Sequence, residues 1–221
     1  MTLERESARL EDPGAKLLDS ISSHWARYGR MVMIGGGVVA AIAVGAFFTL
    51  RARAADEEQA AGKLAEANLF FWQGAYDRSL PIALQVAVQW PKSPSGIDAH
   101  RLAGDNHFWL GKFKDSAAEY RLYLARKKSG LVSETVRRSL AYALESDHQF
   151  KDAALVYVGQ VGKFDRESSA EFLYAAARCY RQLNQPKEAE QVLKRLLDEY
   201  GETSQANRAR ILLAELAAAP R

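Results

Sequence analysis

The order of apolar and charged residues divides the chain into two unlike parts. Residues 31–50 form a run of twenty residues without a charge, which lies between Arg30 and Arg51. At a rise of 1.5 Å per residue, a helix of this length spans roughly 30 Å, which matches the hydrocarbon core of a bilayer. Glycine is tolerated in such a helix because the backbone finds no other hydrogen-bonding partner in lipid. The pattern predicts one transmembrane helix at residues 31–50.

Two other interpretations of this run are weaker. Ala52-Arg53-Ala54 has the small-x-small form of a signal-peptide cleavage site. However, the apolar run exceeds the usual length of a signal peptide, about 30 residues precede it, and arginines follow it directly. A buried helix of a soluble domain is disfavoured because no polar residue interrupts the run. The sequence therefore favours an uncleaved membrane anchor.

Small residues recur at every fourth position within the predicted span, at Gly37, Ala41 and Gly45. This spacing places them on one helix face, where they allow a second helix to approach closely. Small residues are also common in membrane helices for other reasons. A helix-packing role for this stripe and a neutral role both remain open.

The tail before the span, residues 1–30, contains a second helical pattern. Asp12-Pro13 is suited to a helix start, with aspartate as the N-cap and proline at the first helical position. Apolar and aromatic residues then share one face, at Leu17, Ile21, Trp25 and Tyr28. Aromatic rings settle at the headgroup level of a bilayer, so this pattern predicts an amphipathic interfacial helix. A mostly disordered tail is the alternative.

Charge changes this picture little. The chain has 30 Lys and Arg against 27 Asp and Glu, with a net charge of +3, and the two signs are interspersed. Such a balance indicates no nucleic-acid partner. Three basic residues flank each side of the span, so the positive-inside rule does not decide its orientation. The single cysteine, Cys179, excludes an internal disulfide and is typical of a small buried hydrophobe.

A repeat with a period of 36–37 residues follows the membrane segment. Residues 71–76 (FWQGAY) recur as residues 108–113 (FWLGKF), and related turns follow at residues 148–150 and 184–186. Glycine or asparagine at a turn accepts the backbone conformation that joins two antiparallel helices. Each turn is followed by a small residue that lets the helices pack, at Ser79, Ser116, Ala153 and Ala189. A large residue comes next at Tyr120, Tyr157 and Leu193, whereas the first repeat has Ala83.

This pattern resembles the tetratricopeptide repeat family over about residues 60–219. Counted from Ala60, Ile97, Glu134 and Ala170, the repeats keep its turn, its aromatic residue after the turn and its small residues. The resemblance implies an all-α fold with one transmembrane helix followed by a solenoid of about four helical hairpins. Ser204 would cap the start of a last helix that contains Ile211, Leu212, Leu213 and Leu216. This helix would cover the exposed end of the array. The domains would be the tail at 1–30, the span at 31–50, a helical connector at 51–59 and the repeats at 60–221.

In this family the first helix of each repeat lines a concave binding face. The resemblance therefore implies a partner-binding groove formed by Asn68, Phe71, Trp72, Arg101, Asp105, Phe108, Trp109, Arg138, Tyr142, Glu145, Tyr174, Arg178 and Arg181. Aromatic residues and arginine are enriched in binding hot spots. Packing of the two Phe-Trp pairs between adjacent hairpins is an equal alternative. The Lys/Asn set with which some members clamp a terminal carboxylate is not reproduced, because Leu64, Asp98 and Thr135 occupy those places.

The sequence contains no recognisable catalytic or metal-binding pattern. His100 and His107 are seven residues apart, whereas zinc sites on helices use histidines at i and i+4 or a tight Cys/His cluster. The run Gly35-Gly36-Gly37 lies inside the predicted span and is no phosphate loop. We therefore expect no enzyme activity, no cofactor and no small-molecule substrate.

The whole layout resembles the bacterial ancillary subunit of the Sec translocon, with its short polar tail, one span and several degenerate repeats. That resemblance implies an inner-membrane protein with a cytoplasmic N-terminus and periplasmic repeats that assist secreted proteins. The expected function is a membrane-anchored scaffold for protein partners, with membrane lipid around the anchor. The alternative is a structural accessory subunit of a large membrane complex, such as an energy-converting assembly, docked through its span and its repeat surface.

Overall fold

The computed structural model describes residues 13–218 of the chain, all of its regular structure being helical over that range. The chain divides into two compact units, Met1–Ala54 and Ala55–Arg221, which are described separately below. The first helix, α1, has the bounds Pro13–Trp72, so its last part belongs to the second unit.

In the first unit, the described residues are helical from Pro13 onward, whereas Asp12, the predicted N-cap, lies outside the described residues. The four apolar and aromatic side chains of the predicted interfacial face, from Leu17 to Tyr28, are 47–63% exposed. The apolar side chains of residues 31–50 are exposed as well. Among the described helices, α1 is the one that is long and apolar enough to cross a membrane.

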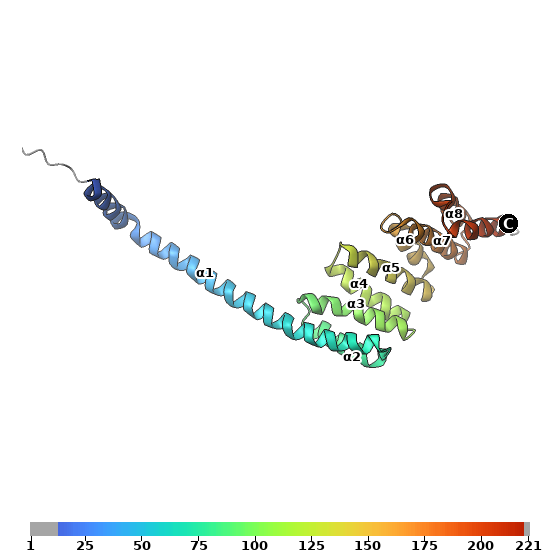
Figure 1. Ribbon diagram of the computed structural model, residues 1–221, viewed down its shortest axis with the longest axis horizontal. Helices are drawn as coiled ribbons and strands as arrows, with labels where there is room; N and C mark the ends of the chain where they lie inside the picture. The colour runs from blue at the N-terminus through green and yellow to red at the C-terminus, as the bar shows by residue number, and fades with distance from the viewer. Residues whose placement is uncertain (1–12, 219–221) are drawn as a thin grey trace, which may run out of the picture. The chain divides into compact units, whose positions relative to one another are not determined.

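The second unit consists, over its described residues, of four helical hairpins and a final helix (Figure 1). The end of α1 pairs with α2 (Tyr76–Gln89), α3 (Pro94–Trp109) with α4 (Phe113–Arg126), α5 (Leu131–Ser146) with α6 (Phe150–Gln160), and α7 (Arg166–Gln182) with α8 (Pro186–Tyr200). The last helix is α9 (Gln205–Ala218). Each helix packs mainly on its neighbours in the sequence, which confirms the predicted repeat solenoid.

A left-handed residue closes each of the four hairpins. The φ angles are +75° at Gly74, +72° at Gly111, +59° at His148 and +53° at Asn184. In every case the next residue donates its N–H to a carbonyl five positions back, as Lys112 does to His107 at 2.9 Å. This hydrogen bond satisfies a carbonyl at the end of the first helix. The predicted turn positions are confirmed, including the two that lack glycine.

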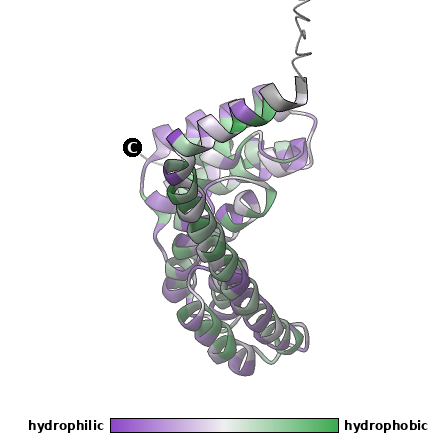
Figure 2. Cartoon of the chain, turned by 90° about the vertical axis from the view of Figure 1, so that its left-hand side faces the viewer, coloured by the Kyte–Doolittle hydropathy of each residue, from purple (hydrophilic) through white to green (hydrophobic). Residues whose placement is uncertain are grey.

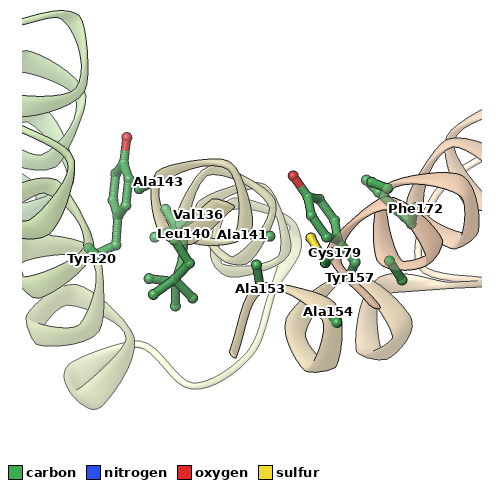
Figure 3. Close-up of a cluster of buried hydrophobic side chains, with 14 of the residues drawn as sticks. Tyr120, Val136, Leu140, Ala141, Ala143, Ala153, Ala154, Tyr157, Phe172 and Cys179 are labelled. Atoms are coloured by element: carbon green, nitrogen blue, oxygen red, sulfur yellow. The ribbon is translucent and has the colours of Figure 1, made fainter. Parts of the chain in front are cut away.

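The hairpins pack through four pairs of residues spaced 16 positions apart along the chain. Small residues of the first helices are buried together with the second-helix residue of their own hairpin: Ala67 with Ala83, Gly104 with Tyr120, Ala141 with Tyr157, and Ala177 with Leu193. Figure 3 shows the central cluster, in which Tyr120 and Tyr157 lie on either side of α5. Cys179 is buried there, as predicted, and burial raises the pKa of its thiol to about 12. Both hydrophobic and hydrophilic positions occur along the repeat helices (Figure 2).

The final helix takes the place of a further first helix rather than being capped by its own serine. The Ser204 hydroxyl donates to Glu167 of α7 at 2.9 Å, and the Ser204 N–H does so as well. The same pair of bonds joins Ser95, at the start of α3, to Glu57 of α1. Leu212 of α9 is buried, whereas Ile211 is 61% exposed and does not cover the core. The expected cap helix is present, but Ser204 serves the neighbouring repeat.

Replacing Gly111 by alanine tests the left-handed turn. An added Cβ would meet no atom within 4 Å, so its cost is purely conformational. We expect Gly111→Ala to lower the free energy of unfolding by about 1 kcal/mol, because an L-residue is disfavoured in this region. Urea denaturation followed by tryptophan fluorescence measures the change.

The matched control for this turn variant is Gly62→Ala on α1, where the added Cβ again meets nothing within 4 Å. This glycine is helical, so alanine should raise the free energy of unfolding by about 0.5–1 kcal/mol. Equal effects of the two substitutions would contradict the assignment of the turn.

Replacing Gly104 by alanine tests the packing of Tyr120. A Cβ at this position would lie 2.6 Å from two carbons of the Tyr120 ring. We expect Gly104→Ala to lower the free energy of unfolding by about 1–3 kcal/mol, as overpacking of a core does. Gly159→Ala on α6 adds the same methyl group into open space and serves as the control. Equal midpoints of thermal unfolding for the two variants would show that the Tyr120 ring can move aside.

Candidate partner-binding surface

The two Phe-Trp pairs divide their roles between packing and exposure. The Phe71 ring meets the Tyr76 ring edge-on with centroids 5.4 Å apart, and Phe108 meets Phe113 in the same way. Each phenylalanine therefore closes the end of its own hairpin. Trp109 instead stacks on Tyr76 of the preceding hairpin, with 5.8 Å between centroids and 9° between planes. Trp109 therefore packs between two adjacent hairpins, which is one of the two roles that the sequence left open.

Both tryptophans nevertheless remain largely open to solvent. The exposed fraction is 81% for Trp72, whose ring contacts Phe71, and 62% for Trp109. Asn68, one turn before Trp72, donates its side-chain amide to the Leu64 carbonyl at 2.9 Å. Large exposed aromatic side chains are the usual anchors of protein interfaces. The predicted roles in packing and in binding are thus compatible at Trp109.

A cavity of about 180 Å³ lies between α3, α4 and α5. Its walls include four residues that the sequence placed in the groove, Asp105, Phe108, Trp109 and Tyr142. Tyr120 and Ser139 complete the lining. The sequence pattern did not indicate Tyr120 as a groove residue because it lies on a second helix. Ser139 lies on the first helix α5 but is neither aromatic nor an arginine. The recurrence of tyrosine at the same place of two repeats, at Tyr120 and Tyr157, was the sequence signal that could have indicated Tyr120.

Asp105 forms the charged part of this cavity. Its Oδ1 accepts a hydrogen bond from the Tyr120 hydroxyl at 2.8 Å, and its Oδ2 accepts one from Arg101 at 3.0 Å. Arg101 also donates to both oxygens of Asp98, at 2.8 and 2.9 Å, which raises the pKa of the guanidinium. Burial raises the pKa of Asp105 despite these two donors. Burial and the nearby carboxylate likewise raise the pKa of Tyr120.

The predicted residues of the last two hairpins lie in contacts between neighbouring repeats. Tyr142 donates to Glu171 at 3.1 Å, and burial raises its pKa to about 12. The other such contacts are Arg178 with Glu145 at 3.0 Å, Arg181 with Glu215 at 3.1 Å and Arg138 over the Phe164 ring at 5.4 Å. Within α7 itself, Arg178 also lies over the Tyr174 ring at 5.8 Å. Exposed ion pairs of this kind add little stability. These contacts nevertheless engage side chains that would otherwise be free to bind a partner.

Two further sets of residues complete the picture. The His100 ring lies 2.7 Å from Glu119, and within residues 13–218 no group of three or more His, Cys, Asp or Glu side chains is placed to hold a metal ion. In the first unit, the stripe residues Gly37, Ala41 and Gly45 are exposed. A Cβ added to Gly37 or Gly45 would meet no atom within 4 Å. This face of α1 is therefore open.

Known proteins resemble the chain in its repeats. A family model for the tetratricopeptide repeat matches residues 144–216. A crystal structure from Podosopora anserina, described as a putative kinesin light chain with nearly identical TPR-like repeats, matches with a TM-score of 0.56 and 15% identity, over 72% of this chain and 86% of that one. A search of curated protein sequences gave no match.

A tetratricopeptide repeat protein from Parabacteroides merdae matches with a TM-score of 0.60 and 16% identity, over 72% of this chain and 60% of that one. BtubC from P. vanneervenii has a TM-score of 0.52 and 13% identity, with 68% of each chain covered. At such identities the solved structures show a shared fold. Together with the family match, which runs from the end of α5 through α6, α7 and α8 into α9, they support the tetratricopeptide repeat family for the helical array of this chain.

Proposed function

We propose that this chain is a membrane-anchored scaffold that binds protein partners through its repeats. Tetratricopeptide arrays are typically non-catalytic interaction scaffolds. The observation that carries the proposal is the cavity beside Trp109, where an exposed aromatic side chain and a carboxylate lie together on the stacked helices. Aromatic anchors beside a pocket are the usual centre of a protein interface.

The anchor is assigned to residues 31–50. These residues lie within the described helix that has the length and composition of a membrane span. The layout resembles the ancillary Sec translocon subunit of bacteria, which supports a cytoplasmic N-terminus, periplasmic repeats and an inner-membrane location. A role as a translocon-linked chaperone for secreted proteins follows from the same resemblance. Lipid would surround the exposed apolar side chains of the span.

Reporter fusions test the anchor and its orientation. We expect alkaline phosphatase fused after Arg221 to be active in bacterial cells, because that enzyme acquires its disulfides only outside the cytoplasm. A green fluorescent protein fused before Met1 should fluoresce from the membrane fraction. Carbonate extraction should leave the protein in that fraction. Activity only of a cytoplasmic reporter after Arg221, or release by carbonate, would overturn the assignment.

A fixed accessory subunit of a large membrane complex is the second candidate. The open Gly37/Ala41/Gly45 face of α1 favours it, since small residues let another transmembrane helix approach closely. In that case the span would dock permanently against another subunit. The repeats would contribute a second docking face.

Purification from the native membrane in mild detergent separates the two candidates. We expect substoichiometric translocon components and secreted clients to accompany the wild-type protein, and Trp109→Ala to reduce the clients by about tenfold. Gly37→Leu places a bulky side chain at the start of the small-residue stripe and should leave the clients unchanged. Constant stoichiometry with one complex, lost in Gly37→Leu, would favour the accessory subunit instead. Failure of any protein to co-purify would contradict both.

A further inference from the structure

We propose that the cavity between α3, α4 and α5 receives the side chain of a lysine or arginine from an exposed segment of a partner protein. This inference rests on the proposed scaffold function and specifies the chemistry that the scaffold recognises. It concerns the six lining residues Asp105, Phe108, Trp109, Tyr120, Ser139 and Tyr142.

The size of the cavity suits one side chain. Its volume of about 180 Å³ is smaller than the roughly 300–1,000 Å³ of typical small-molecule sites. Four of its six lining residues are aromatic, namely Phe108, Trp109, Tyr120 and Tyr142. Aromatic faces attract cations, and tryptophan does so most strongly. The long aliphatic stem of lysine or arginine also packs well against apolar walls.

The carboxylate of Asp105 shares its one guanidinium partner with Asp98. Asp98 and Asp105 supply two carboxylates, and Arg101 supplies the one guanidinium that bridges them. The two donors of Asp105 use only part of the roughly four acceptor positions of a carboxylate. Burial also raises its pKa, which indicates that the two donors do not compensate the lost hydration. A further cation would compensate it.

The next repeat shows a related arrangement in which one guanidinium contacts both a carboxylate and an aromatic ring. The Tyr157 hydroxyl donates to Glu145 at 2.7 Å, as Tyr120 does to Asp105. There Arg178 lies against both the Glu145 carboxylate, at 3.0 Å, and the Tyr174 ring, at 5.8 Å.

Asp105 is paired with Arg101 of its own helix at 3.0 Å, so the cavity differs from the next repeat in its rings. Among the described residues, no cationic side chain lies over the ring of Phe108, Trp109 or Tyr142. The chain thus places its own guanidinium over the ring in one repeat and leaves the equivalent position beside Trp109 for a partner.

Small probes test this inference directly on the full chain in a non-ionic detergent. The probes are the Nα-acetyl, N-methylamide derivatives of lysine, arginine and norleucine, with norleucine as the uncharged isostere of lysine. Incorporated 5-fluorotryptophan gives separate ¹⁹F signals for the four tryptophans, assigned with single Trp→Phe variants. We expect lysine and arginine to shift the Trp109 signal saturably, with dissociation constants of about 1–10 mM. Trp72 should not respond.

Three variants locate the binding site. Asp105→Asn keeps an acceptor for the Tyr120 hydroxyl and should weaken both cationic probes by about tenfold. Ser139→Arg places a cation in the cavity from within the chain and should abolish the shift, with circular dichroism verifying the fold. Asp77→Asn removes an exposed carboxylate outside the cavity and should change nothing.

The inference would be overturned by an equal response to norleucine, by no saturable response of Trp109, or by full binding to Asp105→Asn. If partners co-purify equally with the wild-type protein and with Ser139→Arg, the proposed scaffold function is retained. The proposed recognition of a basic side chain is then contradicted. If nothing co-purifies while the cationic probes bind at Trp109, the scaffold proposal fails and the chemistry of the cavity stands.

Discussion

The packing of a large residue against a small one, inside the second, third and fourth hairpins, is the interaction on which the rest of the repeat unit depends. Gly104 permits the Tyr120 ring to lie directly on α3, where no Cβ would fit. The ring then carries its hydroxyl to Asp105. Because the ring is buried and the hydroxyl is hydrogen-bonded, the carboxylate is held in one orientation at the surface. The core of the hairpin therefore shapes the cavity beside Trp109.

The four hairpins use this arrangement unequally. Tyr120 and Tyr157 each combine a buried ring with a bond to a carboxylate, whereas Ala83 and Leu193 fill the same place without any polar group. Among the four described hairpins, a hydrogen bond from a buried tyrosine to a carboxylate at this place therefore occurs in the two central ones. Tyr120 and Tyr157 are also the two largest fully buried side chains of the unit (Figure 3).

Intramolecular ion pairs further narrow the surface that a partner can use. Arg178 and Arg181 were both expected in the groove, yet each is held by a glutamate of a neighbouring repeat element. Such exposed ion pairs add little to the stability of the fold. Their main effect is to reduce the access of a partner to these arginine side chains. Within the described residues, Trp72 and Trp109 form no such ion pair, and most of their side-chain surface is exposed to solvent. The exposed aromatic residues are thus concentrated in the first two hairpins.

The sequence by itself determined those features whose cause is local. The uncharged run at 31–50 specifies the length of an apolar helix, and the turn residues at 74, 111, 148 and 184 follow from the left-handed backbone that a helical hairpin requires. Periodicity also placed the buried small residues and Tyr120, Tyr157 and Leu193, because each repeat reuses the same contact. Only the tertiary structure decided which groove residues remain available. Asp105 and Tyr142, 37 residues apart, meet at one cavity, whereas Arg178 is taken by Glu145, since these outcomes depend on how consecutive hairpins stack and not on the pattern within any one of them.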